Sequence, residues 1–373
     1  MYFKIKYRFW SRQPVFHMHN LFYWCFPVGI IEKKPPKLKK FFDTKITSKD
    51  ISLLSTINKK SVHQLIHSFY LNNHDTNYLP TLKGIFSYFE NHNDKSFISM
   101  LFQQKQRVDY TNKQTFINKQ LIAVITSRPL EIHLKDGNFS GNIHYVDYLC
   151  IDPEQRGKRI APKLIFTHQA RVRNNSKNQV FLFKRETKLS TIVPLTTYYT
   201  YGFDTKYWKY PKKEIADLNI ICINQQNMTL FSDLIKIIKK KMICTILPFM
   251  GHIQHLIKEK QLIIYVLIHK DEPTACFVFR KSHTYYNEYS SIDLIVSFYE
   301  KETINYEIFY YYFKLILKKH HYRYLVIENI GHNNYLIKKI FEKYVPLIKS
   351  PTGYYFYNYA YRPLFSDQLF ILN

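Results

Sequence analysis

The segment from Val146 to Pro162 restricts the fold of this chain more than any other. It reads as an apolar strand, a short basic loop and a helix in direct succession. Backbone N–H groups at such a loop and helix start point outward and bind phosphate oxygens, and the fixed charges of Arg156, Lys158 and Arg159 add to that attraction. This order predicts an α/β core with a phosphate-binding turn, although an ordinary basic surface turn fits the same residues. The expected elements are a strand over residues 142–151, a loop over 153–159 and a helix over 162–172.

The rest of the N-terminal half supports an α/β reading. The sequence Ser-Val-His-Gln at 61–64 fits a capping box and predicts the start of a helix, which ends near Tyr70. Pro129 is expected to divide two strands, because proline cannot donate a hydrogen bond to a neighbouring strand. The residues Lys-Asp-Gly at 135–137 predict a turn. The two strands are expected over 119–125 and 131–134.

The chain has 373 residues, more than one hydrophobic core usually organises, so two domains are expected. A polar stretch near residues 208–214 marks the boundary, which gives domains of 1–208 and 209–373. The second domain repeats the α/β theme. Its expected helices lie at 230–243, 304–315 and 335–344, and its expected strands lie at 262–268, 275–280, 324–327 and 354–359.

The formal net charge of +26 favours an anionic ligand, such as a phosphate-bearing cofactor, nucleic acid, ribosomes or an anionic membrane. Lysines are spread along the whole chain and no basic/aromatic RNA-binding motif occurs, so we expect no stable nucleic-acid partner. Five scattered cysteines with no CxxC pair indicate neither a disulfide framework nor a metal site. No apolar run is long enough to span a membrane. We expect a cytoplasmic monomer with at most weak ribosome or anionic membrane association.

The basic loop departs from the general GNAT acyltransferase pattern, Arg/Gln-x-x-Gly-x-Gly/Ala, in an informative way. Arg156 and Ala161 fit the pattern, whereas Arg159 stands at its first glycine. In this respect the chain resembles the N-myristoyltransferases, in which a strand ending Asn-Phe-Leu-Cys-Val precedes Leu-Arg-Ser-Lys-Arg-Leu-Ala-Pro. Here Asp147–Ile151 reads Asp-Tyr-Leu-Cys-Ile, and Gln155–Pro162 reads Gln-Arg-Gly-Lys-Arg-Ile-Ala-Pro.

Three further segments extend this resemblance in the same order along the chain. Ile125–His133 resembles the family's Ile-Ser-Ala-Ile-Pro-Ala-Asn-Ile-His, and Tyr7–Val15 resembles its Tyr-Lys-Phe-Trp-Asp-Thr-Gln-Pro-Val. Gly353–Tyr359 resembles its Leu-Gln-Tyr-Tyr-Leu-Tyr-Asn-Trp. The stretch between Tyr201 and Tyr322 matches by pattern alone.

The resemblance implies two tandem GNAT-like lobes that form a continuous saddle-shaped mixed sheet flanked by helices. It implies transfer of myristate from myristoyl-CoA to the N-terminal glycine of peptides and proteins, without a metal. The N-terminal aromatic residues and the strand and loop after residue 149 would then bind the acyl-CoA. The implied residues are Tyr7, Arg8, Phe9, Trp10, Cys150, Ile151, Arg156, Gly157, Lys158, Arg159, Ile160, Ala161 and Pro162.

The implied chemistry is direct acyl transfer. The backbone N–H groups of Tyr148 and Leu149 would stabilise the thioester oxyanion, and a bulge in the strand would expose them. The α-carboxylate of Asn373 would take the proton of the glycine ammonium, and the apolar run before it could bury that carboxylate and raise its pKa. Asp147 is the next candidate for the base. Cys150 reads as buried packing, because no basic partner for a nucleophile is evident.

The peptide side matches the family less well than the acyl-CoA side. The family's acidic loop Tyr-Val-Glu-Asp-Asp-Asp becomes Tyr-Leu-Asn-Asn-His-Asp at 70–75, and its Tyr-Thr-Ala-Gly becomes Leu-Phe-Lys-Arg at 182–185. Its Arg-Tyr-Trp-His becomes Thr-Tyr-Tyr-Thr at 197–200. The residues expected to contact the peptide are Tyr70, Asp75, Tyr198 and Leu372.

Three alternatives remain open from the sequence. The first is another GNAT-fold N-acyltransferase with a different acyl chain or amine acceptor. The second is a basic, non-catalytic nucleic-acid-binding protein, for which the charge of +26 is the best support. The third is a degenerate relative of the family that binds its ligand without catalysing transfer, given the changes on the peptide side.

Overall fold

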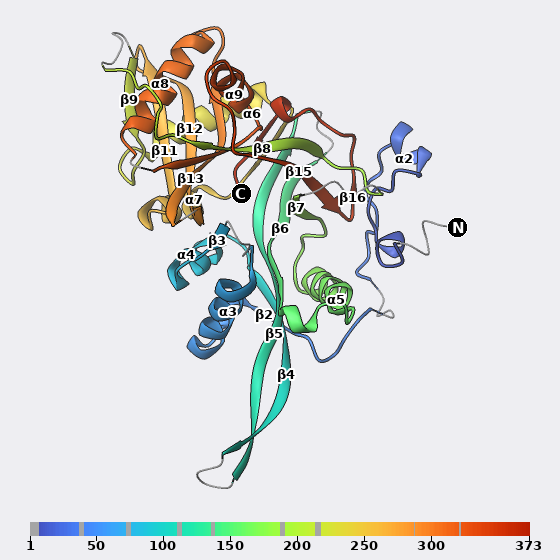
Figure 1. Ribbon diagram of the computed structural model, residues 1–373. Helices are drawn as coiled ribbons and strands as arrows, with labels where there is room; N and C mark the ends of the chain where they lie inside the picture. Colours follow the sequence, from blue (N-terminus) through green and yellow to red (C-terminus); the bar gives the residue numbers. More distant parts are fainter. Residues whose placement is uncertain are drawn as a thin grey trace.

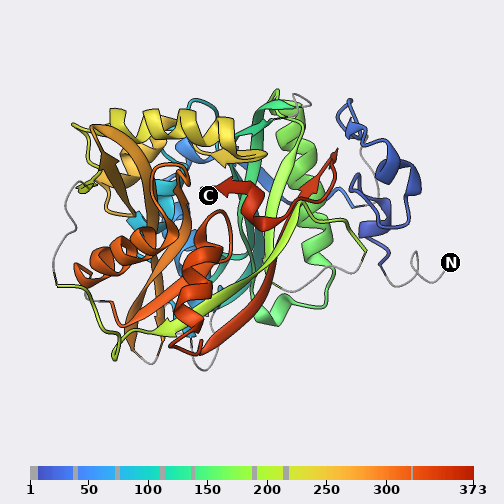
Figure 2. The same cartoon turned by 90° about the horizontal axis from the view of Figure 1, so that it is seen from above.

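The computed structural model describes residues 7–36, 41–71, 76–109, 114–135, 139–186, 191–212, 218–286, 288–320 and 322–373. One large mixed sheet runs through these residues, with helices on both faces (Figure 1, Figure 2). Its strands follow the spatial order β17 (Leu369–Ile371), β10 (Cys244–Leu247), β5 (Gln114–Leu134), β6 (Ser140–Ile151), β7 (Phe181–Glu186), β15 (Ile348–Tyr357), β8 (Thr196–Asp204), β14 (Tyr324–Glu328), β13 (Tyr289–Tyr299), β12 (Glu272–Tyr286), β11 (Leu262–His269) and β9 (Leu218–Cys222). The prediction of an α/β fold with one large mixed sheet is confirmed.

Within the described residues, three further strands extend this sheet at its sides. β4 (Phe97–Asp109) pairs with β5 in a long hairpin that projects from the body (Figure 1), and β2 (Thr47–Asp50) pairs with β4. β3 (Thr76–Tyr78) pairs with β12. A separate two-stranded ribbon joins β1 (Gly29–Ile30) to β16 (Tyr359–Ala360) and fixes the N-terminal segment to the chain near its other end.

Helices pack on each face because the strands alternate their apolar side chains. Val124 of β5 packs with α3 (Thr56–Phe69) and α4 (Leu82–Phe86), whereas Ala123 and Ile125 pack with α5 (Ile160–Asn175). In β12, Cys276 and Val278 face α6 (Met228–Lys241) and α7 (Met250–Lys258). Phe277, which lies between them, faces α8 (Tyr306–Lys318) and α9 (Asn333–Phe341) on the other side of the sheet. A hydrophobic core therefore lies on each face of the sheet.

The same strand–helix–strand unit occurs twice. β6, α5 and β7 form one parallel crossover, and β13, α8 and β14 form another. The proposed boundary near Trp208 nevertheless stays a prediction, because strands are exchanged across it. β10, β15 and β17, all from residues beyond 209, pair within the N-terminal part of the sheet.

The predicted start of α3 is wrong. α3 begins at Thr56 with Ser55 as its N-cap, and Ser61 lies inside the helix, where its hydroxyl donates to the Ile57 carbonyl at 3.1 Å. The capping-box letters therefore mark a helix interior. The predicted turn at 135–137 extends outside the described residues.

Pro129 does not divide β5, which runs unbroken through it. β4 covers one edge of β5 up to Ser127, and β10 covers that edge from Glu131 onward. Opposite Pro129, His144 donates its N–H to Val180 at 2.9 Å, so this pair exchanges no hydrogen bonds. The proline nitrogen consequently faces the gap between β4 and β10, where no ladder donor is required.

Candidate active site

A cavity of about 760 Å³ opens where β6 and β7 separate in the middle of the sheet. The two strands pair only at residues 144–146 with 181–183, and then diverge. Both halves of the chain supply the walls, including Trp10, Phe183, Glu328 and Asn373. A parallel pair that splits in this way leaves the facing backbone groups of both strands without ladder partners. The cavity thus has polar backbone along a wall that also carries apolar, aromatic and charged side chains.

β6 carries a bulge at the mouth of this split. Two residues, Asp147 and Tyr148, stand opposite the single residue Thr126 of β5. The Tyr148 N–H donates to the Thr126 hydroxyl at 3.1 Å. One of the two expected oxyanion donors therefore already has a partner on the β5 side.

The N–H of Leu149 faces the other way. Asp152 donates to the Ile122 carbonyl at 2.9 Å, and hydrogen-bonded and non-hydrogen-bonded pairs alternate along this antiparallel ladder. Leu149 pairs with Ile125 in a position that exchanges no bonds with β5. Its N–H accordingly points toward the open edge, and its side chain is 38% exposed and lines the cavity.

The N-terminal segment closes one side of the cavity. The Trp10 ring stacks on Phe183 with centroids 5.8 Å apart, and the Phe9 ring meets Phe41 edge-on at 5.2 Å. Gln13 accepts a hydrogen bond from the Tyr357 hydroxyl at 2.8 Å. Trp10 thus gives the cavity an aromatic wall on this side, and Arg8 is exposed two residues before it in the sequence.

The basic loop lies beyond the end of β6 and does not line the cavity. Gly157 and Arg159 both adopt left-handed backbone conformations, with φ of 80° and 59°, and α5 begins directly afterwards at Ile160. Such turns aim successive N–H groups outward. Arg156, Lys158 and Arg159 are all exposed, and the Lys158 ammonium donates to Gln155 at 2.9 Å. The loop therefore has the accessible charge and backbone that a phosphate group requires.

A buried ion pair lies beside the bulge. Arg128, only 1% exposed, donates from Nε to the Asp147 carboxylate at 2.8 Å. Its guanidinium lies over the Tyr88 and Tyr145 rings at 5.4 and 5.3 Å, and its Nη1 has no hydrogen-bond partner. Burial raises the pKa of Asp147, an effect that Arg128 opposes.

A second charged network lies deeper in the same cavity. Glu328 contacts Lys184 at 2.8 Å and Arg280 at 3.7 Å, and it accepts a hydrogen bond from the Tyr198 hydroxyl at 2.6 Å. Burial works against ionisation of Glu328, but the two cations outweigh it and lower the carboxyl pKa. Arg280 also pairs with Asp293 at 3.1 Å. Each carboxylate of this network already has a cation beside it.

The last residues of the sequence enter the cavity from β17. This strand pairs in parallel with β10, and the Leu372 N–H donates to Ile246 at 2.8 Å. Asn373 is 4% exposed and lines the cavity, and its side-chain amide donates to the Tyr145 hydroxyl at 2.6 Å. Residue 373 is thereby held beside Tyr145, whose ring also carries the Arg128 guanidinium.

The structure brings six of the 21 residues that the sequence singled out into one cavity. The predicted residues that line the cavity are Trp10, Tyr70, Asp147, Tyr148, Leu149 and Asn373. Tyr198 acts on the site through Glu328, and Leu372 is buried behind Asn373. Cys150 packs beneath α3, and burial raises its thiol pKa to about 12, so any contact would come from its backbone. Asp75 lies outside the described residues.

The sequence analysis missed most of the charged residues in the cavity. These are Arg128, Lys184, Arg280, Asp293 and Glu328. Two signals were available: a charged residue stands inside or at the end of an apolar strand at Arg128 and at Glu328, and Lys184 replaces a small residue of the family motif. Their pairing could not be read from the sequence, because the partners lie on different strands.

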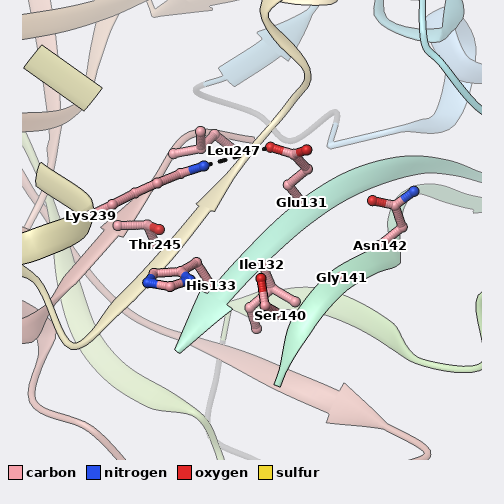
Figure 3. A pocket seen from close by; sticks show the side chains of 9 residues that line it. All are labelled: Glu131, Ile132, His133, Ser140, Gly141, Asn142, Lys239, Thr245 and Leu247. Atoms are coloured by element: carbon pink, nitrogen blue, oxygen red, sulfur yellow. Dashed lines mark ion pairs between the residues drawn. The ribbon is translucent and has the colours of Figure 1, made fainter. Parts of the chain in front are cut away.

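A smaller pocket of about 130 Å³ lies at the far end of β5 and β6, against β10 (Figure 3). Lys239 and Glu131 face each other across it at 3.8 Å, with Thr245 and His133 beside them. None of the predicted site residues lies in this pocket. Within the described ranges, no cluster of His, Cys, Asp and Glu side chains could hold a metal ion. No helix in the described part of the chain is long and apolar enough to span a bilayer.

The split strands, the aromatic N-terminal wall and the basic turn before α5 are typical of an acyltransferase fold of the GNAT type. Residues 27–193 match the family model "Myristoyl-CoA:protein N-myristoyltransferase, N-terminal domain". This match covers residues 27–193 of the 373, so the similarity to the N-myristoyltransferases in sequence is shown for that part of the chain. No curated protein matches the chain in sequence.

Solved structures extend the likeness over the whole fold. An N-myristoyltransferase from Saccharomyces cerevisiae with bound myristoyl-CoA aligns with a TM-score of 0.69 at 15% identity, covering 96% of this chain and 94% of that one. A second structure of the yeast enzyme with myristoyl-CoA gives 0.71 at 15% identity, over 96% and 89% of the two chains. A third, with myristoyl-CoA and inhibitors, gives 0.70 at 14% identity, over 96% and 91%. At this identity the likeness establishes the fold.

Proposed function

We propose that this protein transfers a myristoyl group from myristoyl-CoA to the N-terminal glycine of acceptor peptides. The observation that carries the proposal is the cavity at the split between β6 and β7. It joins an outward-facing N–H at Leu149 with Asn373, the last residue of the sequence. The family match over residues 27–193 and the two-lobed fold support it.

The acyl-CoA would lie along the split. Trp10 and Phe183 would cover its apolar part, and the turn before α5 would hold phosphate oxygens through backbone N–H groups and the cations of Arg156, Lys158 and Arg159. The Leu149 N–H would then face the thioester oxygen. A positioned donor at this oxygen stabilises the charge that develops during acyl transfer.

The transfer itself needs a neutral amine. The α-carboxylate of Asn373 would take one proton from the glycine ammonium, and the amine nitrogen would attack the thioester carbonyl carbon. The carbonyl oxygen carries the negative charge until the C–S bond breaks. The thiolate of coenzyme A then leaves and takes the second proton, which the attacking nitrogen loses as it becomes an amide. Asp147 is the next candidate for the base, but Arg128 already occupies one of its oxygens.

A thermal-shift comparison tests this proposal. A specific ligand raises the midpoint of unfolding with its concentration, so myristoyl-CoA should raise it more than acetyl-CoA at equal concentration. A single-stranded oligonucleotide should give a smaller, salt-sensitive shift, because its binding would depend on surface charge. Equal shifts with both thioesters would contradict a long-chain acyl site, and the largest shift with the oligonucleotide would favour nucleic-acid binding.

The basic turn provides a more local prediction. Replacing Arg156 and Lys158 by glutamine should weaken binding of myristoyl-CoA at least about tenfold at low salt, because charge-assisted contacts to phosphate are lost. Isothermal calorimetry measures the change. Lys206→Gln combined with Lys209→Gln removes two exposed cations elsewhere and should leave the affinity unchanged. Equal weakening in both variants would mean that only the net charge matters.

Acceptor selection provides another prediction. The buried cavity carboxylates Asp147, Asp293 and Glu328 each contact a cation, so none offers a free charge to a basic acceptor side chain. Changing a downstream lysine of a glycine-starting peptide to glutamine should therefore alter kcat/KM by less than about tenfold. A peptide series that varies this one position measures the effect. A loss of about a hundredfold or more would mean that another acid of the lining, such as the exposed Glu186, pairs with the acceptor lysine.

A further inference from the structure

Six large apolar side chains are exposed together on the segment around α2 (Leu21–Cys25). They are between 43% and 75% exposed, and we call them the α2 patch: Met18, Leu21, Phe22, Trp24, Phe26 and Val28. Monomeric proteins rarely expose contiguous apolar groups of this size unless the surface contacts something. In Figure 1 and Figure 2 α2 lies at the outside of the molecule near the N-terminal end of the chain, away from the helices of the core.

The patch belongs to a firmly held segment. On its inner side, the buried Phe16 packs against the rings of Tyr23 and Trp24 at 5.7 and 5.1 Å. The Trp24 indole donates to the Met18 carbonyl at 3.0 Å, and Asn20 caps the helix. One side of the segment is therefore anchored while the other side presents apolar groups to the outside.

The chain after the patch is fixed as well. β1 follows directly and pairs with β16. The Glu32 carboxylate forms a salt bridge with the buried Arg173. The guanidinium of Arg173 also donates to the backbone carbonyls of Glu32 and Lys34 at 2.8 and 2.7 Å. The segment that carries the exposed apolar side chains is thus attached to the rest of the fold both before and after the patch.

The sequence around the patch is strongly basic. Residues 1–40 contain nine lysines or arginines and a single acid, Glu32, which is paired with Arg173. Among the described residues, Arg12, Lys33 and Lys34 are exposed close to the patch in the sequence. Exposed aromatic side chains with cations nearby in the sequence suit the interface of an anionic bilayer. At such an interface tryptophan and phenylalanine lie at headgroup depth, and each nearby cation adds attraction to the acidic lipids.

We propose that the α2 patch binds the surface of anionic membranes, with its aromatic side chains inserted at the headgroup level and Arg12, Lys33 and Lys34 facing acidic lipids. Neither signal alone holds a protein on a bilayer, whereas the two together do. The inference does not depend on the proposed acyl transfer, because none of the six side chains lines the cavity. Membrane binding would bring the protein close to the lipid bilayer, in which long-chain acyl groups dissolve.

Co-sedimentation with vesicles tests the proposal. The protein should partition onto vesicles of phosphatidylcholine mixed with phosphatidylserine, and much less onto phosphatidylcholine alone. Phe22→Ser combined with Phe26→Ser should reduce the partition coefficient at least about tenfold. The Phe22 ring contacts the rings of Phe26 and Tyr23, and both phenylalanines are exposed, so the folded core should be unchanged. Lys33→Gln with Lys34→Gln should weaken binding and flatten its salt dependence.

The matched control is Val345→Ser combined with Leu347→Ser, which removes two strongly exposed apolar side chains elsewhere and should leave binding unchanged. An unchanged thermal midpoint and unchanged myristoyl-CoA binding verify that each variant is folded. The proposal is overturned if phosphatidylserine has no effect, or if both serine pairs reduce binding equally. It is also overturned if light scattering reveals a dimer that disappears in the Phe22/Phe26 variant, because the patch would then cover a second copy of the chain.

Discussion

Protein produced with a short tag after Asn373 should transfer acyl groups about 10²–10⁴-fold more slowly than protein that ends at Asn373, the usual loss when a positioned general base is removed. Asn373 is almost fully buried, and β17 fixes its position through its pairing with β10. A tag would convert the α-carboxylate into an amide that cannot accept the proton. Single-turnover transfer from myristoyl-CoA to a glycine-starting peptide measures the rate.

Two comparisons make this experiment specific. Asn373→Ala keeps the carboxylate but loses the hydrogen bond from the side chain to the Tyr145 hydroxyl, which costs about 1 kcal/mol of positioning at most. This variant should therefore retain most of its activity, as should Tyr145→Phe. Binding of myristoyl-CoA should survive the tag, because the N-terminal wall and the basic turn are unchanged. Full activity of the tagged protein would place the base elsewhere, with Asp147 examined next.

Asp147→Asn alone should lower the free energy of unfolding by about 3–5 kcal/mol, because it leaves the buried Arg128 without a counter-charge. Arg128→Ile alone should cost a similar amount by leaving the carboxylate unpaired. The double variant should recover most of the loss, since isoleucine and asparagine are the residues that the family motifs have at these two positions. Urea denaturation measures the three free energies in one cycle.

The cycle also separates stability from catalysis. If the pair is only structural, the double variant should regain both stability and turnover. If Asp147 also holds the acceptor amine, KM for the peptide should rise in the double variant although its stability is restored. Additive losses across the cycle would mean that Arg128 and Asp147 do not depend on each other.

The sequence predicted the helices with strong periodic patterns and the strand–loop–helix unit. α6 and α8 lie within a few residues of their expected ranges, and the loop before α5 has the expected form. The start of α3 was wrong because a serine and a glutamine at capping-box spacing also occur within helices, where the serine bonds backward to a carbonyl. Local patterns identify elements better than they identify ends.

The site was predicted only where one segment carries it. Trp10, the bulged part of β6 and residue 373, each singled out by a local motif, all line one cavity. The network of Lys184, Arg280 and Glu328 joins three strands that are remote in sequence, so no local pattern contains it. The same holds for β10 and β17, whose short parallel pairing brings Asn373 into the cavity.

The most direct test of the central claim is the product of a single reaction. Purified protein, myristoyl-CoA and two peptides that differ only in an N-terminal glycine or alanine are mixed, and the peptides are analysed by mass spectrometry with a thiol reagent to follow free coenzyme A. The proposed function predicts a myristoyl amide on the α-nitrogen of the glycine peptide, released thiol in equal amount, and little product with alanine. Thiol release without acylated peptide, or equal acylation of both peptides, would contradict it.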